Sequence, residues 1–543
     1  MEKKIKNVLT FLILLLASVI IIGSIYYAKE YPEQDFDQVL YYALNGVETA
    51  APTVINSVIA VCIVPVGVLS MLLYIFTIRD VEIKRYCTYK FKGKDKKIQI
   101  FPIKITAYHR KKYLIVVTLV ALIVAVFCLK INIYLKNKIL STKIFEDYYV
   151  DGKNINITFP EQKRNLILIV SESMENTLLS KDNGGMWENS IIPELEELAI
   201  ENVNFSNTDC LGGAHQTYGT NYSVAGIVAM TSGIPLKTGD ILINKNTYIG
   251  NGKYLEGTYA LGEVLGEQGY NLEIMLGSDA TFGGRRQYLE TNGGYKIFDV
   301  TYAIEQGKME VNDITWWGFE DDKLFEWSKE EITNLYSQGQ PFNYVMVTAD
   351  THFPDGYLSP NVELKYDSQY ENVYAYSSKS INEFINWAKT QEFYENTTIV
   401  ILGDHLGMQA EFYEEKIKDA NYTRTIYNCI INGIPQATNN KNRTFTTMDM
   451  YPTILASIGV KIEGERLGLG TNLYSGIPTL AESLGLDVFC SEISKNSVWY
   501  NRFILGSDYY EMKKIIPESE GKNEENISSS TNVLWGRSCT WML

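Results

Sequence analysis

Histidine and cysteine are scarce in this chain. Its 543 residues include four histidines and seven cysteines, and the cysteines are scattered without the short spacings of a structural metal site. Disorder-prone polar composition is confined to a short stretch between residues 517 and 531, and no internal repeat is present. These absences exclude a disordered chain and a repeat protein. At this length the chain exceeds one ordinary domain and can bury a large core.

Charge is distributed unevenly along the chain. Residues 1–139 carry 19 Lys and Arg against 9 Asp and Glu, which gives +10, whereas the whole chain has a net charge of −15. The remaining residues therefore carry −25. Because an acidic body repels phosphate backbones, we expect no nucleic acid among the partners.

Three long apolar runs lie near the amino terminus, at about residues 8–27, 53–78 and 113–133. Each is long enough to span a bilayer. The loop at 79–112 holds 12 Lys and Arg against 3 Asp and Glu, whereas the loop at 28–52 holds one Lys against five acids. The positive-inside rule then places the amino terminus and the basic loop in the cytoplasm.

This pattern predicts a multi-pass protein of the cell membrane (plasma or inner membrane). We predict a membrane domain at 1–138 with three transmembrane helices, a connector at 139–160, and an extracytoplasmic domain at 161–543. Membrane lipid is therefore an expected partner.

The extracytoplasmic part alternates between short apolar runs and helix-like segments. The apolar runs are 166–170, 272–276, 344–348, 398–402 and 427–431, and helix-like stretches such as 193–200 and 321–335 lie between them. This alternation predicts an α/β domain with a mostly parallel central sheet and helices on both faces.

Metal-binding residue types follow three of the predicted strands. Glu172 follows the first, Asp350 and His352 follow the third, and Asp404 and His405 follow the fourth. Because the carboxyl ends of parallel strands share one edge of a sheet, we expect a shared metal site there. Carboxylates with one imidazole suit Mn or Mg, with Zn as the alternative. Each residue alone is equally compatible with a loop cap.

A hydroxyl nucleophile is expected just before the helix-like run at 224–230. Thr220 lies at or just before the expected amino terminus of that helix, where backbone amides and the helix dipole stabilise a phosphate. We expect the helix to begin at Asn221 or Tyr222, which leaves Ser223 about one turn inside. On local grounds alone, Thr220 also fits a simple N-cap, which is a common role for threonine.

Taken together, these segments resemble the sulfatase branch of the alkaline phosphatase superfamily. The matching pieces span most of residues 160–480, and their order and number make the set specific although each is short. They are Ser171-Glu172-Ser173, Gly219-Thr220, residues 225–229, Gly233-Ile234-Pro235-Leu236, Trp317-Gly318 with Asp321, residues 350–356, Gly403-Asp404-His405, residues 449–453 and residues 466–470. Within that branch the chain resembles the membrane-anchored phosphoglycerol transferases, which include lipoteichoic acid synthases, and most resembles the enzyme that modifies periplasmic glucans.

The resemblance implies a metal-dependent transferase. In this reading Thr220 attacks the phosphorus of phosphatidylglycerol and forms a phospho-threonine intermediate, with Ser223 as the second choice of nucleophile. A hydroxyl of an extracytoplasmic glycan or a glycerophosphate polymer then accepts the glycerophosphate group.

The resemblance also implies a set of ligands for one divalent cation, namely Glu172, Thr220, Asp404 and His405. It implies substrate contacts from Arg286 and His352. Arg285, the neighbour of Arg286, competes for the arginine's role.

Other activities share this fold, among them phosphoethanolamine transferase, phosphodiesterase and sulfuric ester hydrolase. The last requires a Cys/Ser-x-Pro-x-Arg sequence, and none lies near Thr220. Four histidines fit the phosphoethanolamine transferases poorly, because that group carries more histidine for zinc and more disulfides. A non-catalytic anchored binding protein is disfavoured because Thr220, Glu172, Asp404 and His405 occur together.

The predicted orientation can be tested at Cys87, which lies in the basic loop. We expect impermeant thiol reagents to label Cys87 only after the membrane is opened, because that loop is predicted to be cytoplasmic. Labelling of Cys87 in intact cells whose wall admits the reagent would reverse the orientation.

Overall fold

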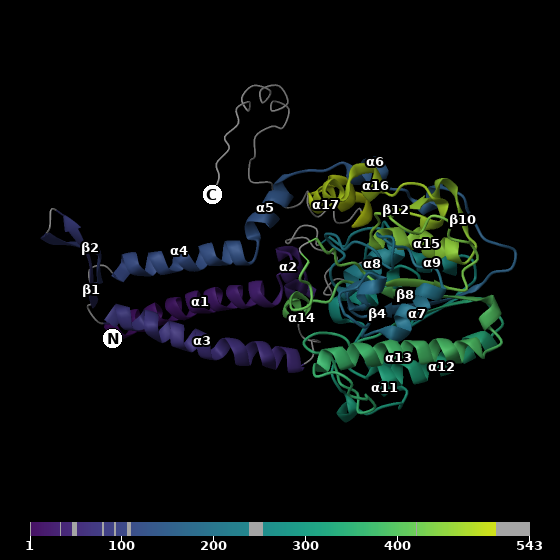
Figure 1. Cartoon of the computed structure of the whole chain (residues 1–543), viewed down its shortest axis with the longest axis horizontal. Coiled ribbons are helices and arrows are strands. Elements are labelled where there is room, and N and C mark those ends of the chain that lie inside the picture. The colour runs from purple at the N-terminus through teal and green to yellow at the C-terminus, as the bar shows by residue number, and fades with distance from the viewer. Residues whose placement is uncertain are drawn as a thin grey trace, which may run out of the picture.

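A computed structural model describes residues 2–32, 34–45, 52–78, 81–91, 94–105, 110–237, 254–419 and 421–506. Three long apolar helices extend from one side of a larger α/β domain (Figure 1). They are α1 (Glu2–Glu30), α3 (Pro52–Ile78) and α4 (Arg110–Cys128).

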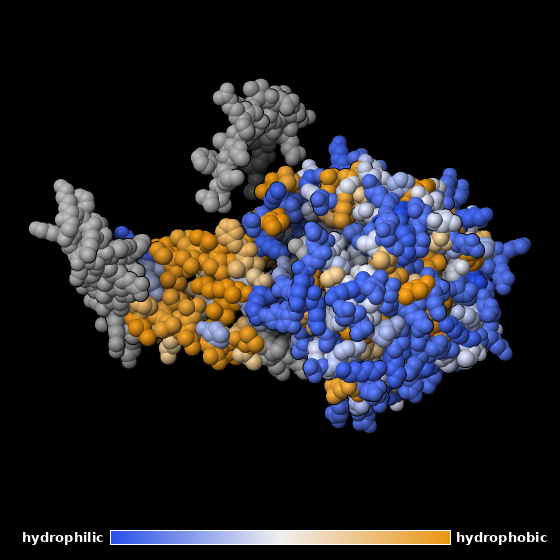
Figure 2. All heavy atoms as spheres, in the orientation of Figure 1, coloured by the Kyte–Doolittle hydropathy of each residue, from blue (hydrophilic) through white to orange (hydrophobic). Residues whose placement is uncertain are grey.

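These three helices have the length and composition to cross a membrane, over 5–30, 59–77 and 110–128. Their outward surface is hydrophobic (Figure 2), as expected of helices that face lipid tails rather than water. Leu14 and Ala17 of α1 pack against Val117 and Ala121 of α4. The basic loop between α3 and α4 forms a hairpin, β1 (Val81–Phe91) with β2 (Lys94–Ile105), at the end of the helices remote from the α/β domain (Figure 1).

The α/β domain is built on a six-stranded sheet in the order β6-β5-β7-β4-β8-β9. The strands are β4 (Asn165–Ser171), β5 (Asn271–Leu276), β6 (Lys296–Phe298), β7 (Phe342–Val347), β8 (Thr397–Gly403) and β9 (Asn428–Ile431). All neighbouring pairs are parallel except β8 with β9. The predicted mostly parallel sheet is therefore confirmed, and the short edge strand β6 is an addition to it.

Alternate side chains of each central strand enter two separate cores, because successive residues of a strand point to opposite faces. Leu166, Leu168 and Val170 of β4 belong to one core, and Ile167 and Ile169 belong to the other. The first face is covered by α8 (Ser223–Ser232), α9 (Leu261–Gly266), α10 (Arg285–Thr291) and α15 (Met450–Ser457). The second face is covered by α7 (Pro193–Glu201), α11 (Val300–Glu305), α12 (Asp321–Ser337) and α13 (Gln369–Lys389). The predicted fold class, with helices on both faces, is confirmed.

Smaller elements complete the domain. They are α5 (Ile131–Ile139), α6 (Ile144–Tyr148), α14 (Ala410–Glu414), α16 (Leu480–Leu484), α17 (Leu486–Ser494), the pair β3 (Ile157–Thr158) with β10 (Lys461–Ile462), and the pair β11 (Arg466–Leu467) with β12 (Gly470–Thr471). Helix α6 lies in the segment predicted as a connector, and its Ile144 and Phe145 are buried in the core of the α/β domain.

The loop between α1 and α3 contains a helix that the sequence reading did not anticipate, α2 (Phe36–Asn45). Its Tyr41 is fully buried and hydrogen-bonds to the hydroxyl of Tyr254 at 2.6 Å and to the carbonyl of Gly283. Next to it, the amide of Asn221 donates to the side-chain oxygen of Gln34 at 2.9 Å. The membrane-proximal segment is therefore attached to the loop that leads into α8.

Candidate active site

The register of the sheet places two acidic strand ends side by side. Strand β4 pairs with β8 so that Ser171 lies opposite Gly403. The next residue of each chain segment, Glu172 and Asp404, therefore emerges at the same point of the same edge. His405 follows directly.

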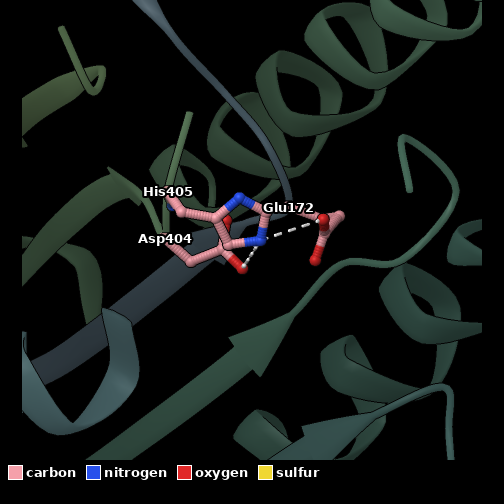
Figure 3. Close-up of side chains that lie close together, drawn as sticks. All are labelled: Glu172, Asp404 and His405. Atoms are coloured by element: carbon pink, nitrogen blue, oxygen red, sulfur yellow. Dashed lines mark hydrogen bonds and ion pairs between the residues drawn. The ribbon is translucent and has the colours of Figure 1, made fainter. Parts of the chain in front are cut away.

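The side chains of Glu172, Asp404 and His405 converge at this edge (Figure 3). The Nε2 atom of His405 lies 3.4 Å from a carboxylate oxygen of Glu172 and 3.4 Å from one of Asp404. All three side chains are almost fully buried. The Nδ1 atom of His405 lies 2.9 Å from the carbonyl oxygen of Leu406. That contact fixes the proton on Nδ1 and leaves the lone pair of Nε2 directed at the carboxylates.

Asp404 carries a buried oxygen that the chain does not satisfy. Its Oδ1 accepts hydrogen bonds from the backbone amides of Ser173 at 2.8 Å and His405 at 2.9 Å. No described residue donates a hydrogen bond to its Oδ2. Burial, and after it the nearby charge of Glu172, raises the pKa of Asp404 to about 7.

This donor set fits a divalent cation. Two carboxylates and an imidazole lone pair converge on one buried point. Burial opposes protonation of His405, but Asp404 and Glu172 outweigh burial and raise its pKa above the ordinary value. A cation at this point would offset the repulsion between the carboxylates of Glu172 and Asp404.

Two hydroxyls reach this cluster. The Oγ of Ser173 donates to Oε1 of Glu172 at 2.7 Å, and the other hydroxyl belongs to Ser223. Its Oγ lies 3.0 Å from Oε2 of Glu172 and 3.3 Å from Nε2 of His405. Thr220 is fully buried instead. Its Oγ1 donates to the carbonyl of Thr217 at 3.0 Å and accepts from the amide of the same residue at 2.9 Å.

The expected start of the helix, at Asn221 or Tyr222, was therefore wrong. Tyr222 is extended, with φ −157° and ψ 159°, so α8 begins at Ser223. Ser223 occupies the first helical position and Thr220 the loop before it. Among the described residues, no hydrogen bond joins Thr220 to Glu172, Asp404 or His405.

A glycine allows α8 to approach the metal ligands this closely. A Cβ atom on Gly226, three residues after Ser223, would lie 2.2 Å from the backbone oxygen of Asp404. Such an approach is impossible for any side chain. Gly226 therefore sets the distance between the start of α8 and the end of β8.

The predicted phosphate-binding arginine is also displaced by one residue. Arg286 forms an ion pair with the buried carboxylate of Asp299 and does not line the cavity described below. Arg285 does line that cavity. Its guanidinium donates to Ser278 Oγ at 2.9 Å and to the carbonyl of Phe282 at 3.1 Å, which holds it in place.

His352 lies at the same cavity, but the preceding Asp350 does not join the acidic cluster. The amide of Asp321 donates to Asp350 at 3.2 Å, and Asp321 in turn accepts from the amide of Ala349 at 2.9 Å. These bonds fix the loop that carries His352. Its ring lies against Trp317, with centroids 4.7 Å apart.

His352 is a neutral hydrogen-bonding group at ordinary pH. Burial lowers its pKa to about 4. Its Nδ1 lies 2.7 Å from the carbonyl oxygen of Phe353, so Nε2 carries the lone pair. The indole Nε1–H of Trp317 is buried and finds no acceptor among the described residues.

A cavity of about 590 Å³ joins these groups. Glu172, Ser223, Arg285, Trp317 and His352 line one part of it. The other part is lined by the α1–α2 segment and by α3, through residues 23, 26, 27, 31, 34, 38, 39, 59 and 62. The candidate metal cluster therefore opens toward the apolar helices.

The chain was compared with family profiles, curated proteins and solved structures. The sulfatase family profile matches residues 164–460, which include all three residues of the metal cluster. The chain belongs to the sulfatase family.

Within the family, similar curated proteins are phosphoglycerol transferase I of Salmonella choleraesuis and of Escherichia coli O127:H6. They are 31% identical to this chain over 340 and 342 residues, which is 61% of this chain. The resemblance inferred from the motifs is confirmed. The match spans 41% of the length of those relatives.

Two solved structures are among those similar to this chain. They are the lipoteichoic acid synthase LtaP of Listeria monocytogenes (16% identity, TM-score 0.47, 70% of this chain and 100% of that one) and the lipooligosaccharide phosphoethanolamine transferase of Neisseria meningitidis (14% identity, TM-score 0.46, 84% of each chain).

Replacement of Asp404 tests the metal cluster. We expect Asp404→Asn to abolish retention of a divalent cation after dialysis, since it removes a charged ligand. Asp321→Asn is the matched control, because Asp321 is also buried with a pKa raised to about 7 by burial but lies outside the cluster. Metal analysis of both purified proteins measures the bound cation, and circular dichroism verifies that both are folded. Equal metal content in the two variants would contradict the assignment.

Metal affinity is also expected to fall as the pH falls. Asp404, whose pKa is about 7, and His405, whose pKa is raised, must both lose protons to bind a cation. We therefore expect binding weaker at pH 6 than at pH 8 by more than about tenfold, because protonation of Asp404 alone accounts for about tenfold and protonation of His405 adds to it. Metal titrations at both pH values measure this ratio, and the same affinity at both would show that these groups do not hold the ion.

Proposed function

We propose that this protein transfers a glycerophosphate group from phosphatidylglycerol to a hydroxyl of an extracytoplasmic glycan or glycerophosphate polymer. The observation that carries the proposal is the contact of Ser223 Oγ with Glu172 and His405 at the start of α8. The names of the similar curated proteins support the choice of group. Ser223 takes the nucleophilic role that the sequence reading gave to Thr220.

In the first step, Ser223 Oγ attacks the phosphorus of the lipid. The new P–O bond forms as the bond to the diacylglycerol oxygen breaks, and the proton of Ser223 passes to that oxygen. Ser223 lies at the amino terminus of α8, where backbone amides and the helix dipole favour the developing negative charge. Diacylglycerol leaves, and glycerophosphate remains on Ser223.

In the second step, the acceptor hydroxyl attacks the same phosphorus. The bond to Ser223 Oγ breaks, and Ser223 recovers a proton from the acceptor. A divalent cation held by Glu172, Asp404, His405 and Ser223 would lower the pKa of the serine hydroxyl and neutralise charge on the phosphoryl oxygens. Mn or Mg suits this oxygen-rich set, with Zn as the alternative.

Three groups of the cavity are suited to hold the substrate. Arg285 supplies positive charge for the phosphoryl oxygens. The unpartnered Nε1–H of Trp317 is a second donor to the same oxygens. His352, with its low pKa, serves as an acceptor for a hydroxyl of glycerol rather than as a proton donor.

The proposal includes the placement of the protein. The three apolar helices cross the cell membrane, the amino terminus and the β1–β2 hairpin lie in the cytoplasm, and the domain from residue 161 onward lies outside. This placement brings the cavity to the membrane surface, where the lipid donor resides.

Paired substitutions test the nucleophile. We expect Ser223→Ala to abolish transfer from phosphatidylglycerol, because it removes the hydroxyl at the start of α8 that contacts both Glu172 and His405. Thr220→Ala should retain most of the activity, since the lost bonds to Thr217 are local and worth about 1 kcal/mol each. Transfer of radiolabelled glycerophosphate to acceptor glycan measures both variants.

A covalent intermediate gives a second readout. Wild-type protein incubated with donor and no acceptor should gain the mass of glycerophosphate, and fragment ions that separate Thr220 from Ser223 should place it on Ser223. The mass on Thr220, or full turnover by Ser223→Ala, would restore the original assignment. Release of free glycerol phosphate with acceptor present and no glycan product would identify a phosphodiesterase instead.

A further inference from the structure

The cavity at Ser223 is lined on one side by the ends of two apolar helices. Gly23, Tyr26 and Tyr27 of α1 line it, as do Ile59 and Cys62 of α3. These positions lie at the ends of the two apolar windows, 5–30 and 59–77, that adjoin the α/β domain. The same ends face the sheet domain in Figure 1. In a bilayer they would lie at the level of the lipid headgroups and ester groups.

The lining changes in character from one end of the cavity to the other. Around Ser223 it is polar and charged, with Glu172 and Arg285. Between α1 and α3 it is aromatic and aliphatic. Tyrosines are favoured where lipid ester groups meet water, because the ring is apolar and the hydroxyl is polar. A phospholipid has the same gradient, from an anionic headgroup to acyl chains.

The α1–α2 segment is held firmly against the reacting groups. The ring of Tyr31 meets Phe353, the neighbour of His352, edge-on at 5.4 Å. Gln34 hydrogen-bonds to Asn221, two residues before Ser223. The wall of the cavity that comes from the membrane helices is therefore in a fixed position relative to the nucleophile.

We infer that the gap between the ends of α1 and α3 is a lateral passage for a two-chain phospholipid. The glycerol ester region of the donor lies beside Gly23 and Cys62 while its acyl chains stay in the bilayer, and diacylglycerol returns by the same path. This inference rests on the proposed function. A passage within the bilayer is expected because the leaving group, diacylglycerol, is apolar, and the transfer of each of its methylene groups to water is unfavourable.

Two glycines provide a matched pair of variants. A Cβ on Gly23 or on Gly67 meets no atom within 4 Å, so both sites accept a side chain without a clash. Gly23 lines the cavity, whereas Gly67 is exposed on α3 and does not line it. Gly23→Phe therefore obstructs the passage, and Gly67→Phe adds the same bulk elsewhere.

The test compares two donors on the full chain in vesicles. One donor is phosphatidylglycerol, and the other is a water-soluble p-nitrophenyl ester of glycerol phosphate. We expect Gly23→Phe to lower lipid turnover relative to soluble-ester turnover by about tenfold, because an overfilled site excludes the lipid. Gly67→Phe should leave the ratio unchanged. An unchanged ratio in Gly23→Phe, or an equal loss of both activities in that variant, would overturn the passage.

A binding measurement does not depend on turnover. In wild-type protein, N-ethylmaleimide should label Cys62 more slowly in phosphatidylglycerol vesicles than in phosphatidylcholine vesicles, with Cys128 of the same chain as the internal reference. Equal relative rates in the two lipids would overturn the passage even if the enzyme is active. Inactivity toward both donors with Cys62 protected would instead refute the proposed reaction and retain the passage.

Discussion

Two buried carboxylates and an imidazole lone pair meet where β4 and β8 end, and the rest of the site depends on their mutual repulsion. An uncompensated buried charge costs several kcal/mol. The raised pKa of Asp404 is a consequence of that cost, because burial and the charge of Glu172 both disfavour its ionised form. Attraction to the same two carboxylates raises the pKa of His405. A protein core retains such a cluster when a cation offsets the cost, which is why the cluster is better explained by metal binding than by stability.

The sheet and α8 then place the reacting hydroxyl against this cluster. The parallel register of β4 with β8 sets Glu172 beside Asp404. Gly226 permits α8 to touch the backbone of Asp404. Ser223, at the first position of α8, consequently contacts both a carboxylate and the imidazole. The hydroxyl, the ligands and the helix amides thus form one unit whose geometry is fixed by backbone packing.

Much of this arrangement could be predicted from the sequence, because it depends on strong local patterns. The apolar runs of the central strands and the residues that end them, Glu172 and Asp404-His405, were identified correctly as strand ends, and they lie together. The choice between Thr220 and Ser223 could not be made, because it depends on the residue at which α8 begins. The extended backbone of Tyr222 sets the start of α8 at Ser223. Tertiary contacts rather than helix propensity determine this backbone conformation. A serine one residue before the apolar Val-Ala-Gly-Ile run was the available signal.

The positions of the two arginines and the role of α2 could not be predicted from the sequence either, because they too depend on tertiary contacts. Arg285 and Arg286 are neighbours, and helix α10 turns one toward the cavity and the other toward Asp299. Helix α2 is short and follows an acidic loop, so its role appears only when Tyr41 is seen to insert between Tyr254 and Gly283. That insertion connects the membrane helices with the loop beside Arg285, and Gln34 connects them with the loop that enters α8. The apolar helices are therefore part of the architecture of the site and not only its anchor. The segment that joins α1 to α3 holds both the loop beside Arg285 and the loop that enters α8.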